Sequence, residues 1–217
     1  MMTVAMPNLA YSLMSLTGIL AAFLTSRALA MPKPAARQQL DVYIAAMAGF
    51  LIGAKLPVWA SYGFHPALIV DGKSVMGAML GAFVALQIYK RVTRQHDEAF
   101  GGRFTIPLAV GIGFGKIGCY LYGCCGGHFI VPVQLVESGF NFAAAGGLYL
   151  FWKRTQRIDL LFPLYLSAYL VMRFLIEFVR TEPRLGAGLT LYQYLALLFL
   201  PVFVSILYQR RHAPCRP

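Results

Sequence analysis

The sequence predicts an all-α, polytopic integral membrane protein with about seven transmembrane helices. Of the 217 residues, 59% are hydrophobic and only 12% are charged, whereas soluble domains carry roughly 25% charged residues. The apolar residues form runs of about 20, the length that a helix needs to cross a bilayer, without the alternation of barrel strands. This composition excludes a disordered chain, a small disulfide scaffold and a nucleic-acid-binding domain.

Seven apolar stretches are interpreted as the spans, in chain order. The first has no Lys or Arg before it, which argues against a secretory signal. The second, third and fourth carry glycines at spacings that let helix backbones approach closely. The last ends shortly before Arg210. The seven stretches are Leu9–Met31, Asp41–Tyr62, Lys73–Tyr89, Phe104–Tyr122, Val131–Trp152, Leu160–Phe178 and Leu191–Tyr208.

The basic residues between the spans alternate, and this alternation predicts the orientation. The first, third and fifth loops and the tail are rich in Lys and Arg, whereas the fourth loop, Gly123–Ile130, has none. By the positive-inside rule, the basic loops are cytoplasmic. We therefore expect the N-terminus outside, the C-terminus inside, and most of the net charge of +11 to be an orientation signal.

A few ionisable residues lie inside the predicted spans, where each costs on the order of 2.5–3.5 kcal/mol on insertion scales. Given the orientation, they and several neighbouring polar residues fall at mid-depth or towards the outer side. In the sixth span, Tyr169, Arg173, Glu177 and Arg180 share one helical stripe. The ionisable residues are Lys55, Lys116, Glu137, Arg173, Glu177 and Arg180, and the nearby amides are Gln134 and Gln193.

Cations outnumber carboxylates in this group by four to two. Arginine can bind a phosphate through two hydrogen bonds, and lysine adds a point charge. A group with surplus cations, open to the outer leaflet, suits an anionic phospholipid head group. A buried ion-pair network that only joins helices is the structural alternative.

Three segments resemble the prolipoprotein diacylglyceryl transferase family. They are 115–118 (GKIG), 132–137 (PVQLVE) and 169–180 (YLVMRFLIEFVR), the last being the most specific. Residues 72–81 and Gln193 resemble further family segments. The resemblance implies one transmembrane domain over residues 1–217, with a first helix and linker in 1–40 and a family-like core at about 46–208.

The resemblance also implies an enzyme of the bacterial inner membrane, with its active site towards the periplasm. Such an enzyme moves the diacylglyceryl group of phosphatidylglycerol to a lipoprotein-precursor cysteine and releases glycerol phosphate. Tyr169 and Arg173 then have catalytic roles. The implied substrate-binding residues are Lys55, Lys116, Gln134, Glu137, Glu177, Arg180 and Gln193.

Several positions differ from the family pattern, and two of them bear on its chemistry. Lys116 stands where the family has its signature arginine, and Met76 stands where it has a histidine before the glycines of the third span. Two other functions therefore stay open. One is non-catalytic binding or transport of an anionic phospholipid on the same scaffold. The other is a membrane thiol oxidoreductase.

Cys119, Cys124, Cys125 and His128 cluster at the predicted outer end of the fourth span. The cluster has four interpretations: a disulfide from Cys119 to Cys124 or Cys125, packed free thiols, a transient acceptor thiol, and a zinc site. Adjacent cysteines seldom ligate one ion, so we expect no metal. We also expect no other cofactor and no nucleic-acid partner, and the sequence indicates no oligomeric state.

Overall fold

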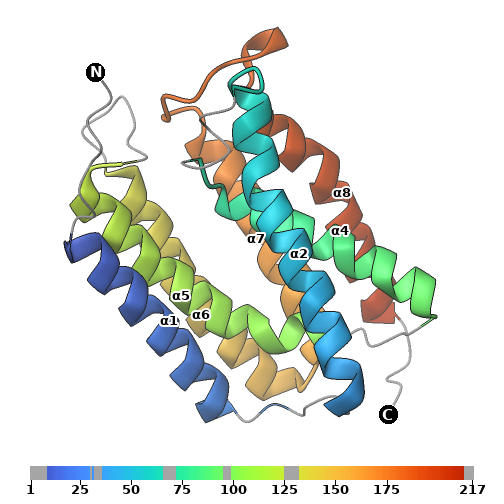
Figure 1. Cartoon of the computed structure of the whole chain (residues 1–217). Helices are drawn as coiled ribbons and strands as arrows, with labels where there is room; N and C mark the ends of the chain where they lie inside the picture. The colour runs from blue at the N-terminus through green and yellow to red at the C-terminus, as the bar shows by residue number, and fades with distance from the viewer. Residues whose placement is uncertain are drawn as a thin grey trace. The chain divides into compact units, whose positions relative to one another are not determined.

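The computed structural model describes residues 9–29, 31, 36–65, 72–94, 99–124 and 132–212. Within these ranges the chain is helical (Figure 1), and an isolated bridge between Arg184 and Thr190 is the one β-type pairing. The predicted all-α fold is therefore confirmed. The elements are α1 (Leu9–Leu29), α2 (Ala36–Ser61), α4 (Val75–Thr93), α5 (Phe100–Tyr122), α6 (Val133–Thr155), η1 (Ile158–Leu160), α7 (Leu161–Ile176), η2 (Gly186–Gly188) and α8 (Leu191–His212).

Each of the seven predicted spans corresponds to one α-helix, and the bounds differ by a few residues. Two helices extend beyond the predicted apolar stretches at their basic ends: α4 continues through Lys90 and Arg91, and α8 through Arg210. Cations are favourable near a helix C-terminus because they face its unpaired carbonyl groups. The sixth span is shorter than predicted, because α7 ends at Ile176.

Six of these helices are long and apolar enough to cross a membrane. The chain is therefore described as a multi-pass membrane protein. The exception is α6, whose face towards its neighbours carries the buried polar residues Gln134, Glu137, Ser138 and Asn141. The helix itself is confirmed, and its crossing of the membrane stays a prediction.

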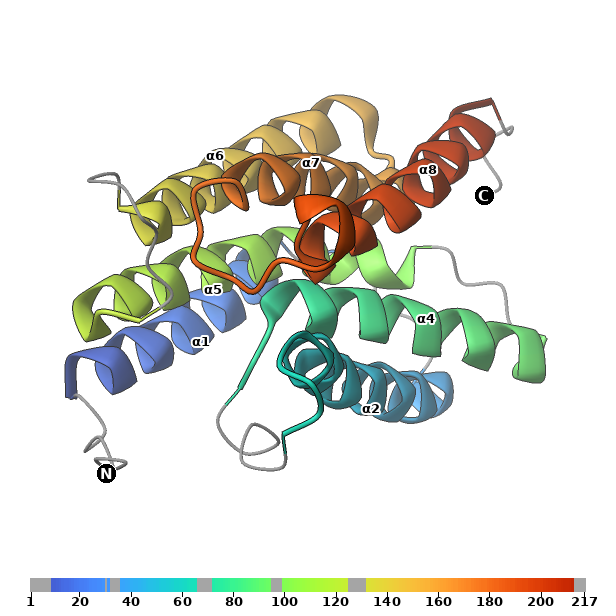
Figure 2. The same cartoon turned by 90° about the horizontal axis from the view of Figure 1, so that it is seen from above.

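The described residues cluster into two compact units, the first formed by Met1–Pro32, Ala99–Thr181 and Val202–Pro217. In it, α5 lies beside α1 and α6 (Figures 1 and 2) and also contacts α7. Close contacts such as Gly113 against the Phe142 ring hold these helices together. Leu161, Leu166 and Phe203 are fully buried in its core.

The second unit comprises Lys33–Glu98 and Glu182–Pro201, and its main element is the pair α2 and α4 (Figure 2). Gly49 and Gly53 of α2 face Gly81 and Gly77 of α4 so closely that the backbones are in contact. Ser74 caps α4 by accepting a hydrogen bond from the backbone nitrogen of Gly77 at 3.1 Å. Glycine is required at this crossing because a side chain would separate the two backbones.

Replacing Gly77 with alanine should destabilise the protein by about 1–3 kcal/mol, the range for overpacking a tight core. A Cβ atom at this position would meet the carbonyl oxygen of Gly53 and lie 2.6 Å from Cγ of Pro57. Gly139→Ala is the matched control, because a Cβ atom there has no neighbour within 4 Å. Thermal unfolding in detergent micelles gives the melting temperatures of both variants, and equal melting temperatures would contradict the prediction.

Candidate active site

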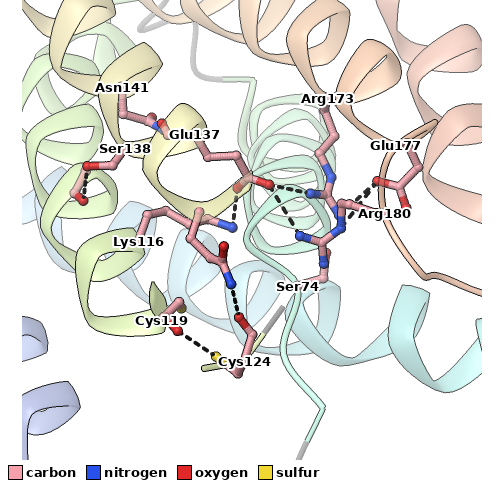
Figure 3. A network of polar contacts seen from close by, with 12 residues as sticks. Ser74, Lys116, Cys119, Cys124, Glu137, Ser138, Asn141, Arg173, Glu177 and Arg180 are labelled. Atoms are coloured by element: carbon pink, nitrogen blue, oxygen red, sulfur yellow. Dashed lines mark hydrogen bonds and ion pairs between the residues drawn. The ribbon is translucent and has the colours of Figure 1, made fainter. Parts of the chain in front are cut away.

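Glu137, near the start of α6, lies at the centre of a buried charge network (Figure 3). Lys116 of α5 forms an ion pair with its Oε2 atom. On the other side, Nη1 of Arg173 lies 2.7 Å from its Oε1 atom and Nη1 of Arg180 lies 3.5 Å from the same oxygen. One carboxylate thus joins three cations from α5, α7 and the segment that follows α7.

Glu177 is the second carboxylate of the network. It follows α7 directly and lies 3.1 Å, through Oε2, from Nη2 of Arg173. The same oxygen lies 3.8 Å from Nε of Arg180. Arg173 therefore bridges Glu137 and Glu177 with its two terminal nitrogens. The stripe that the sequence predicted thus contains one ion pair at i, i+4 and one at i, i+3.

The network is almost completely shielded from solvent. Exposed fractions are 10% for the Lys116 side chain, 6% for each arginine and zero for both carboxylates. Buried charges are costly unless they are paired and hydrogen-bonded. Three cations with two carboxylates leave a formal charge of +1. A single bound anion of charge −1 would neutralise this surplus.

Three polar side chains of α6 hold the helix around Glu137. Nε2 of Gln134 donates to the carbonyl oxygen of Cys124 at 2.6 Å. Oγ of Ser138 donates to the carbonyl oxygen of Gly113, in α5, at 2.8 Å. Gln134 lies one turn before Glu137, and Ser138 directly follows it. The two bonds therefore restrict the rotation of α6 about its axis and its shift along that axis. The third side chain, Asn141, follows one turn later, and its Oδ1 atom accepts a hydrogen bond from Tyr165 of α7.

Tyr169 lies one helical turn before Arg173 on the stripe that the sequence predicted. Its side chain is buried, with 1% of the residue exposed. Its ring centroid is 5.9 Å from that of Tyr165 and 6.3 Å from that of Phe140 in α6. The tyrosine thus belongs to the same interior region of the first unit as the charge network.

The structure brings together most of the predicted site residues. Those in the first unit are Lys116, Gln134, Glu137, Tyr169, Arg173, Glu177 and Arg180. Lys55 and Gln193 belong to the second unit, where Lys55 is partly buried in α2. Met76, at the position of the missing family histidine, is buried in α4 of that unit.

Gln193 has a local structural partner at the start of α8. Its Oε1 atom accepts a hydrogen bond from the backbone nitrogen of Thr190 at 2.9 Å, and its own backbone nitrogen donates to Oγ1 of Thr190 at 3.3 Å. This reciprocal arrangement is a capping box. The side chain therefore stabilises the helix start, and a contact with substrate stays a prediction.

The sequence interpretation did not single out Ser138, Asn141 and Tyr165. All three are buried polar residues that contact neighbouring helices of the first unit. A signal was present: Asn141 lies four residues after Glu137, and Tyr165 lies four residues before Tyr169. Extending the polar positions of α6 one turn beyond Glu137, and the stripe of α7 one turn before Tyr169, would have included both residues.

The cysteine cluster is described in part. Cys119 and Cys124 are not joined to each other by a disulfide, and Sγ of Cys124 instead lies 3.7 Å from the carbonyl oxygen of Cys119. The predicted contributions of Cys125 and His128 lie outside the described residues. Among the residues that the structure describes, no three His, Cys, Asp or Glu side chains are grouped to hold a metal ion.

Comparison with known proteins decides the family. The sequence model of the prolipoprotein diacylglyceryl transferase family matches residues 3–209. This chain belongs to that family. The resemblance inferred from the three sequence segments is therefore confirmed, and the prolipoprotein diacylglyceryl transferase match covers both units of the structure.

Curated members of the prolipoprotein diacylglyceryl transferase family are similar over most of the chain. A phosphatidylglycerol–prolipoprotein diacylglyceryl transferase of Dehalococcoides mccartyi is 27% identical over 203 residues, covering 79% of this chain and 76% of the relative. One from Clostridium perfringens is 26% identical, covering 69% of this chain and 68% of the relative. One from Aeromonas salmonicida is 27% identical, covering 69% and 63%.

Proposed function

We propose that this chain is a membrane transferase that moves the diacylglyceryl group of phosphatidylglycerol to the cysteine thiol of a prolipoprotein. Family membership and the names of the bacterial relatives support the reaction. The buried network around Glu137, with its surplus positive charge, supports the assignment of the reaction to this part of the molecule.

The reaction is balanced without a cofactor. The thiol sulfur forms a bond to the glyceryl carbon that carries the phosphate, and the bond from this carbon to the phosphate oxygen breaks. Glycerol phosphate leaves with the electron pair, and the thiol proton is released. The phosphodiester carries one negative charge before the reaction, and the leaving phosphate monoester develops a second one.

The charge of the network matches these demands. Its formal charge of +1 balances the single negative charge of the phosphodiester, so the bound lipid would make the site neutral. As the second charge develops, the guanidinium groups of Arg173 and Arg180 stabilise it by hydrogen bonds that are already oriented. Lys116 adds a compact positive charge on the opposite side of Glu137.

We place the protein in the bacterial inner membrane, with the N-terminus outside, the C-terminus in the cytoplasm and the charge network towards the periplasmic side. The alternation of basic loops supports this orientation. It puts the network in reach of phosphatidylglycerol in the outer leaflet and of prolipoproteins that have crossed the membrane.

The direct test uses the purified protein in nanodiscs that contain isotope-labelled phosphatidylglycerol. A peptide with one cysteine is added, and mass spectrometry detects the diacylglyceryl thioether and the released glycerol phosphate. Equal amounts of the two products are expected. Lipid binding without either product would contradict the transferase assignment and favour the binding protein on the same scaffold.

Replacing Cys119, Cys124 and Cys125 together with serine should leave the transfer rate within about twofold, since substitutions outside the reacting groups change free energies by about 0.5 kcal/mol. The thiol of Cys124 contacts the carbonyl oxygen of Cys119, and the ion pairs of the charge network involve neither cysteine. The same assay measures the rate under oxidising and reducing conditions. Loss of activity, or dependence on redox state, would instead favour the thiol oxidoreductase.

A further inference from the structure

Two buried polar residues form a hydrogen-bonded link to the backbone of Glu137. The hydroxyl of Tyr165, in α7, donates to Oδ1 of Asn141, in α6, at 2.6 Å. Nδ2 of Asn141 in turn donates to the carbonyl oxygen of Glu137 at 2.6 Å. Asn141 is fully buried and Tyr165 is 1% exposed. The link thus runs from α7 to the backbone of the residue that organises the network.

We infer that Asn141 and Tyr165 are positioning residues that hold the Glu137 carboxylate at its place between Lys116 and the two arginines. The kinetic part of this inference rests on the proposed function. Neither residue touches the charged groups in an ion pair, so the pair acts through the backbone of α6. It complements the bond from Ser138 to Gly113, which attaches the same helix to α5.

The geometry of the network gives this link a role beside the bonds of Gln134 and Ser138. Arg173 and Tyr165 lie on one helix, and Glu137 and Asn141 lie on another, so the two helices share both an ion pair and a neutral hydrogen bond. The ion pair to Arg173 holds the carboxylate at the end of the Glu137 side chain. The neutral bond holds the α6 backbone that carries this side chain, and it adds no charge because both partners are uncharged.

The test compares Tyr165→Phe, Asn141→Leu and the double variant Asn141→Leu/Tyr165→Phe. Each single variant leaves one buried polar group unpaired, whereas the double variant removes both and keeps similar shapes. We therefore expect both single variants to unfold at lower temperature and the double variant to regain most of the stability. Ser167→Ala is the matched control, since it removes a bond to the carbonyl oxygen of Pro163 on α7 away from the network.

Turnover separates positioning from a purely structural role. In the double variant kcat should stay lowered by about tenfold, because a small displacement of a preorganised group is costly in the transition state. KM for phosphatidylglycerol should change little, because all five charges remain. A double variant that regains both stability and kcat would show that the pair only joins α6 to α7, and would overturn the inference.

An infrared measurement tests the inference without any activity. The infrared spectrum of the protein labelled with ¹³C-glutamate contains the carboxylate bands. Subtracting the spectrum of Glu137→Gln identifies the band of the Glu137 carboxylate. This band should shift in the double variant and stay in place in Ser167→Ala. An unshifted band overturns the inference. A wild-type protein without transfer activity, combined with a shifted band, would contradict the proposed function alone.

Discussion

Replacing Arg173 with alanine is expected to lower kcat/KM for phosphatidylglycerol by about 100- to 1000-fold, the usual loss when one preoriented group that stabilises transition-state charge is removed. The variant removes the group that bridges Glu137 and Glu177 through two nitrogens, at 2.7 and 3.1 Å. It also lowers the formal charge of the network from +1 to zero. The negative phosphodiester then meets a neutral site.

Arg173→Lys distinguishes charge from geometry in the same assay. Lysine restores the positive charge but has one nitrogen and cannot reach both carboxylates as the planar guanidinium does. We expect it to recover only a minor part of the lost activity. Arg154→Ala, at an exposed arginine near the end of α6, is the control and should be as active as the wild type. Full activity of Arg173→Lys would show that charge alone matters at this position.

The helices were predictable because the apolar runs that form them are long and separated by basic or glycine-rich segments. Their ends were less predictable, since a helix continues beyond the bilayer wherever its residues tolerate water. The apolar stretch that predicts α4 ends at Tyr89, yet the helix continues through Lys90 and Arg91 to Thr93. Hydropathy reports where the apolar environment ends, whereas the backbone hydrogen bonds determine where the helix ends.

The candidate site was predictable where one helix contains the pattern. The spacing of Tyr169, Arg173 and Glu177 requires only the periodicity of α7. The ion pair between Lys116 and Glu137 depends on depth, which the predicted orientation supplied. The bonds from Gln134 to Cys124 and from Tyr165 to Asn141 depend on the rotation of α6 against its neighbours. That rotation follows from packing, and a single sequence does not specify it.

The second large effect concerns stability and is expected for Glu137→Gln. This variant leaves three buried cations with one carboxylate and raises the formal charge of the network to +2. Removing one partner of a buried ion pair costs about 3–5 kcal/mol, because the remaining charge is left uncompensated. Unfolding by denaturant in detergent micelles should show a loss of this size. Asp159→Asn is the control: its pair with Arg157 is more than 20% exposed and should contribute about 1 kcal/mol or less.

Lys116→Met in the background of Glu137→Gln tests whether the loss is electrostatic. Methionine fills the volume of the lysine without its charge, so the double variant returns the network to +1. The double variant should therefore be more stable than the sum of the single effects predicts, by about 0.5–3 kcal/mol, the range for contacting residues in one network. Strict additivity would show that Lys116 and Glu137 do not stabilise each other, and that Glu137 depends on its arginines alone.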